Sequence, residues 1–204
     1  FFFDSPNEEV KLALQNNEDV FLYGAEGSGK SFLLQSTCNY YASDNKSSVY
    51  IPISEAMKHG TDFIDSLEGL DLICLDNIDL IASNKDWEVG IFNLINDCFS
   101  SNCRLIFSSC KNPSSINFEL DDLRSRIKRI DHIELYPISD ANLPEAIKFV
   151  SQLRSINLGD KEINYLVTYS KRNMSDLIDA ISKLDQLSME LKRKITVPLI
   201  KEII

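Results

Sequence analysis

The sequence predicts an α/β base domain with a parallel five-stranded sheet, followed by a small α-helical domain. Short apolar runs alternate with helical patterns up to about residue 138, and such alternation is typical of a parallel sheet with helices on both faces. A glycine-rich loop separates the first apolar run from the helical pattern that follows it. After Ser139 no strand pattern remains. We therefore expect one domain over 1–138 and a second, helical domain over 139–204.

The first strand, the loop and the first helix of the sheet domain occupy residues 20–31, VFLYGAEGSGKS. Gly24, Gly29, Lys30 and Ser31 fall on the GxxxxGK(S/T) spacing of a phosphate-binding loop. Glycines let backbone N–H groups curl around oxygen atoms, and the helix N-terminus favours an anion. Lys30 would reach the β- and γ-phosphates of a nucleotide, and the Ser31 hydroxyl would bind Mg²⁺. The predicted nucleotide-binding residues here are Gly24, Ala25, Glu26, Gly27, Ser28, Gly29, Lys30, Ser31 and Phe32.

The other elements follow from periodicity and turn residues. Further strands are expected at 48–53, 72–76, 104–108 and 132–135. In the base domain we expect a short helix through Leu12 and Leu14, and further helices at 30–42, 54–67, 87–99 and 120–129. The apolar run 72–76 has turns on both sides, which suits a strand buried on both faces. Four helices of a small bundle are expected around 147–153, 163–167, 177–184 and 197–203.

Composition narrows the class of protein. The 204 residues are 44% hydrophobic, which is ample for a packed core. No apolar run approaches the ~20 residues that cross a bilayer, and the opening FFFDSP has no charged region or long apolar core of a signal peptide. The five cysteines include no CxxC pair, which disfavours a disulfide framework and a thiolate metal site. We expect a cytoplasmic protein, and its abrupt aromatic start indicates that further residues precede Phe1.

The charge bears on partners. The formal net charge is −10, and an acidic protein opposes the phosphate contacts through which proteins bind DNA by themselves. The charge is unevenly shared, because residues 1–138 carry 11 Lys and Arg against 22 Asp and Glu, whereas 139–204 carry 10 against 9. This shift supports a domain boundary near Pro137.

Asp76 ends the apolar run 72–76, where a Walker B acid would hold Mg²⁺ beside Ser31. Hydrolysing relatives usually place a second acid at the next position to activate the attacking water. This chain has Asn77 there, and a carboxamide has no comparable basicity. The sequence therefore predicts a magnesium-dependent nucleotide site with slow hydrolysis of its own nucleotide.

Two arginines two positions apart follow an acidic pair in residues 121–126, DDLRSR. On a helix Arg124 and Arg126 would point to different sides, so local acids can hold one while the other is presented outward. Arginine suits a role in trans, because its charged planar group can meet the γ-phosphate on a neighbouring molecule, which raises turnover by about 10³ to 10⁵. Solvated charges that pair with Asp121 and Asp122 explain the pattern equally well.

The sequence resembles the Hda family, which is related to the bacterial replication initiator DnaA, in the segments GAEGSGKS, LICLDNIDLI, DWEVGIFNLIN, LRSRI and KITVPLIKEII. The resemblance covers essentially the whole chain and implies an AAA+ P-loop nucleotide-binding domain with a C-terminal helical lid. DnaA carries a helix-turn-helix DNA-binding domain after its lid, and residues 1–204 contain none. With the acidic charge, this difference disfavours an origin-binding initiator and indicates only indirect contact with DNA.

The resemblance also implies a regulatory function. Proteins of this family hold ADP, associate with the DNA-loaded sliding clamp, and promote ATP hydrolysis by DnaA, which inactivates the initiator and limits re-initiation. In this scheme the chain binds ADP or ATP with Mg²⁺, and Arg126 is the arginine finger that reaches the nucleotide of DnaA. The family's clamp contact is a QL-rich segment that residues 1–204 lack, so it would lie outside this chain. The resemblance implies a nucleoid- or replisome-associated protein without membrane contact. Association of the chain into homo-oligomers is a further possibility that the sequence leaves open.

Two positions depart from the pattern that the resemblance implies. The sensor 1 position, usually polar or acidic, aligns with Cys110, which is a poor hydrogen-bonding group, although Ser108 and Ser109 adjoin it. The sensor 2 arginine of the lid aligns with Ser175. Arg172 lies three residues earlier and is the expected substitute if the helix begins that early.

Other functions remain open at this point. The chain could be an autonomous AAA+ ATPase that acts as a motor or helicase loader, and measurable turnover by the isolated protein would favour that class. A small-molecule P-loop kinase would need an acceptor site that the sequence does not show. The residues favour a nucleotide holder that activates hydrolysis in a partner.

Overall fold

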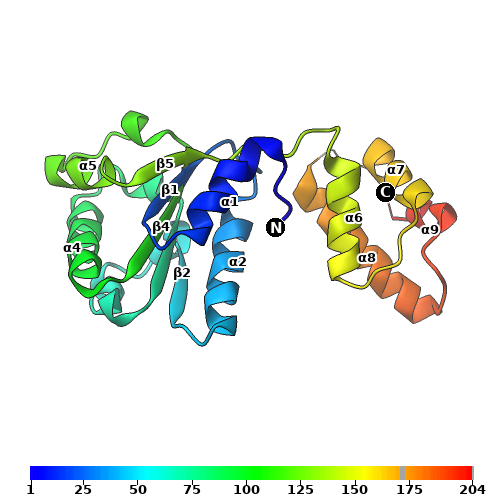
Figure 1. The fold of residues 1–204 in the computed structure, drawn as a ribbon, viewed down its shortest axis with the longest axis horizontal. Helices are drawn as coiled ribbons and strands as arrows, with labels where there is room; N and C mark the ends of the chain where they lie inside the picture. The colour runs from blue at the N-terminus through cyan, green and yellow to red at the C-terminus, as the bar shows by residue number, and fades with distance from the viewer. Residues whose placement is uncertain (171–172, 204) are drawn as a thin grey trace. The chain divides into compact units, whose positions relative to one another are not determined.

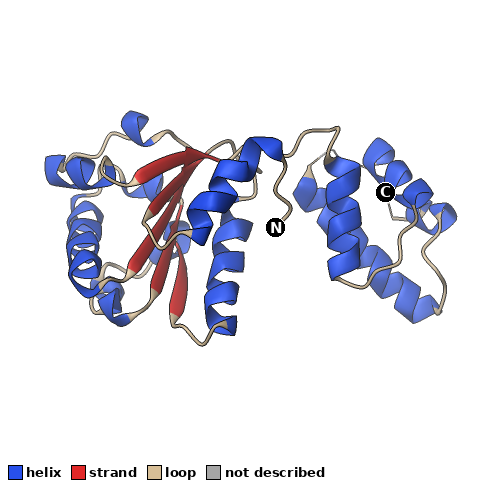
Figure 2. Ribbon diagram, viewed as in Figure 1, coloured by secondary structure: helices blue, strands red, loops and turns tan. Residues whose placement is uncertain are grey.

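The computed structural model describes residues 1–170 and 173–203, and its contacts divide the chain into two compact units. Unit 1 contains Phe1 and Phe3–Pro137, and unit 2 contains Phe2 and the residues from Ile138 onward (Figure 1). Unit 1 is a sheet with helices, and the described part of unit 2 contains helices and no strand (Figure 2). In the described ranges 1–170 and 173–203, the helices are too short or too polar to cross a bilayer.

The sheet of unit 1 has five parallel strands in the order β2-β3-β4-β1-β5. They are β1 (Val20–Tyr23), β2 (Ser48–Pro52), β3 (Leu72–Asp76), β4 (Arg104–Ser109) and β5 (Asp131–Glu134). The five strands expected from the sequence are confirmed, with ends that differ by one residue at β2, β4 and β5. Because all strands are parallel, their carboxyl ends lie along one edge.

Helices cover both faces of this sheet. They are α1 (Glu8–Gln15), α2 (Lys30–Ser43), α3 (Ile53–Ala56), α4 (Lys85–Ser101) and α5 (Asp121–Ile127). Successive strand side chains point to opposite faces. Phe21 and Phe107 stack at 5.9 Å between ring centroids and pack with α3, α4 and α5, whereas Leu22 and Ile106 pack with α1 and α2. This alternation builds two apolar layers, one on each side of the strands.

The predicted helix over 54–67 is wrong. Only Ile53–Ala56 is α-helical, and two short 3₁₀ turns follow at Asp62–Ile64 and Leu67–Gly69. Gly60 and Ser66 adopt positive φ of 78° and 71°, which ends any continuous helix between them. The buried side chain of Ile64, which belongs to this irregular segment, packs in the apolar layer beneath α4.

Unit 2 is a small bundle built from α6 (Leu143–Leu153), α7 (Asp160–Tyr169), α8 (Met174–Leu191) and α9 (Val197–Lys201). Ile147, Leu166, Ile181 and Ile200 are fully buried in one shared apolar cluster. The four helices expected from the sequence are confirmed, although α9 is a short segment of five residues.

A buried carboxylate positions the start of α5. Glu88, in the first turn of α4, is 1% exposed and accepts three backbone hydrogen bonds. Its Oε1 accepts from the N–H groups of Ser83 at 2.9 Å and Glu119 at 3.0 Å, and its Oε2 accepts from Leu120 N–H at 2.7 Å. Leu120 is the residue before α5 begins. Glu88 therefore joins the loop after β3, the start of α4 and the start of α5.

Replacement of Glu88 by alanine should lower the free energy of unfolding by about 3 kcal/mol, because three backbone N–H groups lose their carboxylate acceptor. Urea unfolding followed by circular dichroism measures the change. Glu55→Ala is the matched control, since Glu55 is an exposed carboxylate paired with Lys58 and exposed pairs contribute little. Equal stability of the two variants would contradict the anchoring role of Glu88.

Candidate functional site

The candidate site lies at the carboxyl edge of the sheet, where β1 leads into the glycine loop and α2. Gly24 follows β1, and its N–H donates to the Ser109 carbonyl at the end of β4, at 3.2 Å. A Cβ at Gly24 would lie 2.3 Å from the Leu135 carbonyl oxygen, which is part of the backbone and cannot rotate away. Glycine is required here because the chain passes so close to the segment after β5.

Helix α2 begins at Lys30 with no side-chain cap. Gly29 is the N-cap residue, with φ of 96°, and its carbonyl accepts from Leu33 N–H at 2.9 Å. The first N–H groups of an α-helix have no partner inside the helix, so those of Lys30, Ser31 and Phe32 can donate to an anion. The helix dipole adds favourable potential at the same place.

The other predicted loop residues divide by exposure. Ala25, Glu26 and Gly27 form the exposed crest of the loop, and Ser28 is buried beneath it. Ser28 N–H donates to the Ala25 carbonyl at 3.2 Å, which closes the loop on itself. The loop therefore folds back on itself directly before α2.

Lys30 lies against the inner side of this loop. Its side chain is 5% exposed, and its Nζ donates to the carbonyls of Gly24 at 2.8 Å and Ala25 at 2.9 Å, with the Ser28 hydroxyl at 3.5 Å. A buried ammonium requires such acceptors. Phosphate oxygens are stronger acceptors than carbonyls, so this lysine can exchange loop carbonyls for a phosphate.

Asp76 ends β3 and is 2% exposed, with both carboxylate oxygens bonded to hydroxyl groups. The Tyr50 phenol donates to Oδ2 at 2.6 Å, and the Ser108 hydroxyl donates to Oδ1. The Ser108 oxygen also accepts from Asn77 N–H at 3.0 Å. Burial, together with the bond to Asp76, raises the pKa of Tyr50 to about 12, so the phenol stays protonated and remains a donor.

The structure places Ser108, rather than the sensor 1 candidate Cys110, beside Asp76, the predicted Walker B acid. Cys110 is exposed, whereas Ser108 and Ser109 are fully buried. The Ser109 hydroxyl donates to Asp79 Oδ1 at 3.0 Å. Neither Tyr50 nor Ser108 was among the residues predicted to form the site, because their contact with Asp76 depends on which strands are neighbours in the sheet.

The donor set fits Mg²⁺ shared with a nucleotide. Ser31 and Asp76 offer hard oxygen ligands, and the Tyr50 phenol donates to Asp76. Among residues 1–170 and 173–203, no cluster of three His, Cys, Asp or Glu side chains forms an all-protein metal cage. Mg²⁺ is usually held by one or two protein ligands together with phosphates and water, which agrees with this arrangement.

Aromatic side chains border the phosphate loop, and the sequence pattern did not single out the first of them. The Phe1 ring carbon Cε2 lies 3.1 Å from an ideal Cβ position on Gly29, and the Phe1 ring is 6.3 Å from that of Phe32. Phe32 is 49% exposed in the first turn of α2. The apolar FFF run was a visible signal, but sequence alone did not connect it with a loop so far along the chain.

The two arginines of α5 differ in their contacts. Arg124 forms an ion pair with Asp121, one turn earlier on α5. Arg126 is half-buried, and within the described ranges its guanidinium makes no ion pair. The sensor 2 position Ser175 is exposed in the first turn of α8. The predicted substitute, Arg172, lies outside the described residues.

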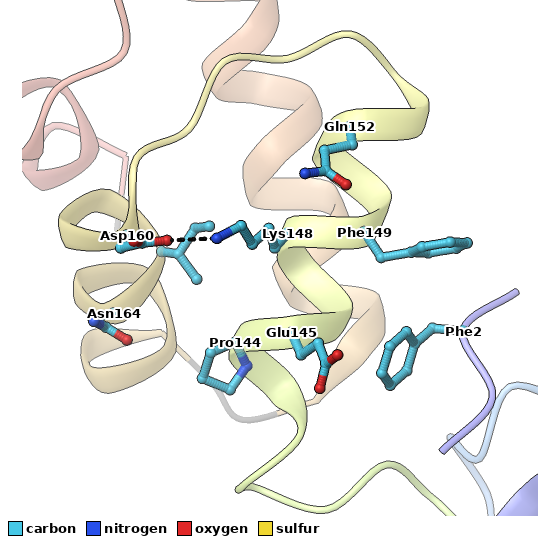
Figure 3. Close-up of a pocket in the computed structure, with 9 residues that line it drawn as sticks. Phe2, Pro144, Glu145, Lys148, Phe149, Gln152, Asp160 and Asn164 are labelled. Carbon is cyan, nitrogen blue, oxygen red and sulfur yellow. Dashed lines mark hydrogen bonds and ion pairs between the residues drawn. The ribbon is translucent and has the colours of Figure 1, made fainter.

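A cavity of about 590 Å³ lies in unit 2 along α6 and α7 (Figure 3). Lys148 Nζ and Asp160 Oδ1 pair across it at 3.0 Å, and the Phe2 ring lies 5.9 Å from Phe149. It contains none of the predicted site residues. The predicted phosphate- and metal-binding residues of the glycine loop and β3 lie at the sheet edge of unit 1.

Comparison with known proteins gives two family matches that together span most of the chain. A family described as "Bacterial DnaA ATPAse domain" matches residues 8–131, and one described as "Hda, lid domain" matches residues 140–204. A Haemophilus influenzae protein described only as an uncharacterized protein is 31% identical over 185 residues, which are 90% of this chain and 80% of that protein.

Solved structures share the fold. Domain III of the replication initiation protein DnaA from Thermotoga maritima has a TM-score of 0.79 and 19% identity, and the match covers 100% of this chain and 95% of that chain. AMPPCP-bound DnaA from Aquifex aeolicus has a TM-score of 0.71 and 21% identity, over 93% of this chain and 65% of that chain. With the family matches, they confirm the predicted AAA+ fold with a helical lid.

Gly24→Ala should destabilise unit 1 by at least about 2 kcal/mol, because the new methyl group meets the Leu135 carbonyl and the backbone must shift. Thermal unfolding of the purified protein measures the loss. Gly69→Ala is the control, since a Cβ there has no neighbour within 4 Å. An unchanged melting temperature for Gly24→Ala would contradict the predicted clash between the new methyl group and the Leu135 carbonyl.

Proposed function

Because this chain belongs to the Hda family of DnaA-related AAA+ proteins, we propose that it is an ADP-holding regulator of replication initiation that activates ATP hydrolysis by DnaA. The observation that carries this proposal is the contrast at the sheet edge between a complete phosphate loop and Asn77, which follows Asp76 in place of a second acid. Such a site is built to hold a nucleotide and lacks the group that would activate a water molecule.

Nucleotide binding is supported by the geometry of the loop. The first N–H groups of α2 have no partner inside the helix, and the buried ammonium of Lys30 is bonded to the loop that precedes them. Asp76 and Ser31 supply oxygen ligands at its side. Mg²⁺, when bound there with a nucleotide, would neutralise phosphate charge. The AMPPCP complex of DnaA from Aquifex aeolicus agrees with an adenine nucleotide as the ligand.

The action on a partner is assigned to Arg126. The neighbouring Arg124 is already paired with Asp121, which leaves Arg126 as the arginine of α5 without an ion pair among the described residues. Glu88 fixes the start of the helix that carries it. A permanently charged planar group on an anchored helix suits an arginine finger that completes the active site of a neighbouring molecule.

The proposed partners are DnaA and the DNA-loaded sliding clamp, with DNA contacted only indirectly. In this scheme the clamp brings the protein to replicating DNA in the cytoplasm, and hydrolysis returns DnaA to its inactive ADP form. The protein is then a negative regulator of re-initiation. Its own hydrolysis of ATP would be slow, since Asn77 cannot serve as a general base.

Lys30→Ala should weaken the binding of ADP at least tenfold, by about 1.5 kcal/mol or more, because a charge-assisted contact to phosphate is lost. Isothermal titration calorimetry with ADP measures the affinity. Lys46→Ala is the control, since Lys46 is an exposed lysine after the other end of α2, paired with Asp44. Equal affinity in both variants would place the nucleotide elsewhere.

Arg126→Ala should abolish stimulated hydrolysis by DnaA while ADP binding to this protein stays unchanged. The assay follows ADP formation on ATP-loaded DnaA in the presence of the protein and clamp-loaded DNA, and a loss of about 10³-fold or more is expected for a finger. Arg124→Ala is the matched control on the same helix and should retain most of the stimulation.

Two results of that assay would contradict the assignment. Loss of ADP affinity in Arg126→Ala would move this arginine into the protein's own nucleotide site. Full stimulation by Arg126→Ala would exclude it as the finger. Turnover of ATP by the isolated protein, removed by Asp76→Ala, would favour an autonomous ATPase such as a helicase loader.

A further inference from the structure

The Tyr50 phenol occupies a central position in the candidate site, between the Walker B acid and the start of α2. It donates to Asp76 Oδ2 at 2.6 Å. Burial and this bond raise the pKa of Tyr50 to about 12, and the nearby side chains of Gln35 and Ser31 oppose the rise. Asp76 and Ser31 are the two residues expected to hold Mg²⁺. A phenol bonded to that acid is placed where the cation, or a water molecule bound to it, would have to be accommodated.

The sheet fixes the Tyr50 ring in this place. Tyr50 lies in the middle of the edge strand β2, in register with Cys74 of β3, and its ring packs against the apolar layer beneath α2. From there the hydroxyl reaches forward to Asp76, which pairs with Pro52 at the end of the strand. Packing of the half-buried ring on one side and the bond of its hydroxyl to Asp76 together hold Tyr50 in this orientation.

The two hydroxyl groups on Asp76 are not equivalent. The Ser108 hydroxyl makes two hydrogen bonds. Its oxygen accepts from Asn77 N–H, and its hydrogen is donated to Asp76. Within residues 1–170 and 173–203, the Tyr50 hydroxyl makes no hydrogen bond to a backbone group and is bonded only to Asp76. Any ligand that claims an oxygen of Asp76 therefore displaces the Tyr50 bond more readily than the Ser108 bond.

We propose that Tyr50 is a positioning residue that sets how strongly nucleotide binding depends on Mg²⁺. Its phenol donates to Asp76 when the cation is absent, and this bond must be given up when a cation or its bound water takes Oδ2. The phenol thus stabilises the metal-free site and opposes the metal-bound one, so a nucleoside diphosphate is retained with little help from Mg²⁺. The inference rests on the proposed nucleotide-binding function and assigns a regulatory residue within that site.

The chemistry predicts the sign of the effect when the hydroxyl is removed. In Tyr50→Phe the ring stays packed, but Oδ2 of the nearly buried Asp76 loses its donor. A buried oxygen without a partner is costly, and a cation or its bound water then repairs that loss. Mg²⁺ should therefore bind the nucleotide complex more tightly in Tyr50→Phe than in the unaltered protein.

The test is calorimetric titration of the whole protein with ADP over a series of free Mg²⁺ concentrations, beginning in a chelator. We expect Tyr50→Phe to reach half of its Mg²⁺ effect at about tenfold lower free Mg²⁺ than the unaltered protein, as the loss of one hydrogen bond to a charged group implies. We also expect weaker ADP binding by Tyr50→Phe in the chelator, and recovery of that affinity as Mg²⁺ is added.

Tyr41→Phe is the matched control. The Tyr41 hydroxyl is also hydrogen-bonded, because it accepts from Arg104 Nη1 at 3.3 Å at the opposite edge of the sheet, although Tyr41 is buried and Tyr50 is half-buried. A general loss of stability would affect both variants, whereas only Tyr50→Phe should change the Mg²⁺ dependence. Thermal unfolding in the chelator and in Mg²⁺ provides a second readout that does not require nucleotide affinity to be intact.

Three results would count against the inference, and they separate it from the proposed function. An unchanged Mg²⁺ dependence in Tyr50→Phe, with ADP still bound, overturns the role of Tyr50 and leaves the proposed function standing. A weaker response to Mg²⁺ in Tyr50→Phe makes the phenol a ligand of the metal site rather than its competitor, and so overturns the inference. Failure of the unaltered protein to bind ADP at any Mg²⁺ concentration overturns both.

Discussion

Two hydroxyl groups hold the buried carboxylate of Asp76, and the candidate site is organised around that pair of hydrogen bonds. Ser108 comes from β4 and Tyr50 from β2, so both bonds exist only because β3 lies between these strands. A carboxylate at 2% exposure is costly without such partners. Ser31, at the start of α2, is near enough to Tyr50 to affect the pKa of its phenol, so Asp76 and the start of α2 lie at the same edge of the sheet.

A second buried carboxylate, Glu88, extends this organisation toward α5. It accepts from Ser83, which follows the 3₁₀ turn after β3, and from the two residues that precede α5. The segment that leaves Asp76 is therefore bonded to the same side chain as the helix that carries Arg126. Glu88 therefore links the segment after β3 to the start of α5, and in the proposed scheme this link joins the protein's own nucleotide site to the helix that carries Arg126.

The glycine loop could be predicted from the sequence because its chemistry resides in neighbouring residues at fixed spacing, as Gly24, Gly29 and Lys30 show. The strands followed from short apolar runs between turns. The roles of Tyr50 and Ser108 could not be predicted, because they depend on strand order, which a single sequence does not supply. The segment 54–67 was misassigned because polar residues at helical spacing also fit the turns that positive φ at Gly60 and Ser66 produces.

The most direct test of the account asks whose ATP is hydrolysed. DnaA is loaded with ATP labelled at the γ-phosphate and mixed with this protein, carrying unlabelled ADP, and with clamp-loaded DNA. The account predicts single-turnover release of labelled phosphate from DnaA that requires the ADP-bound protein. Equal release of labelled phosphate with and without the ADP-bound protein would contradict it.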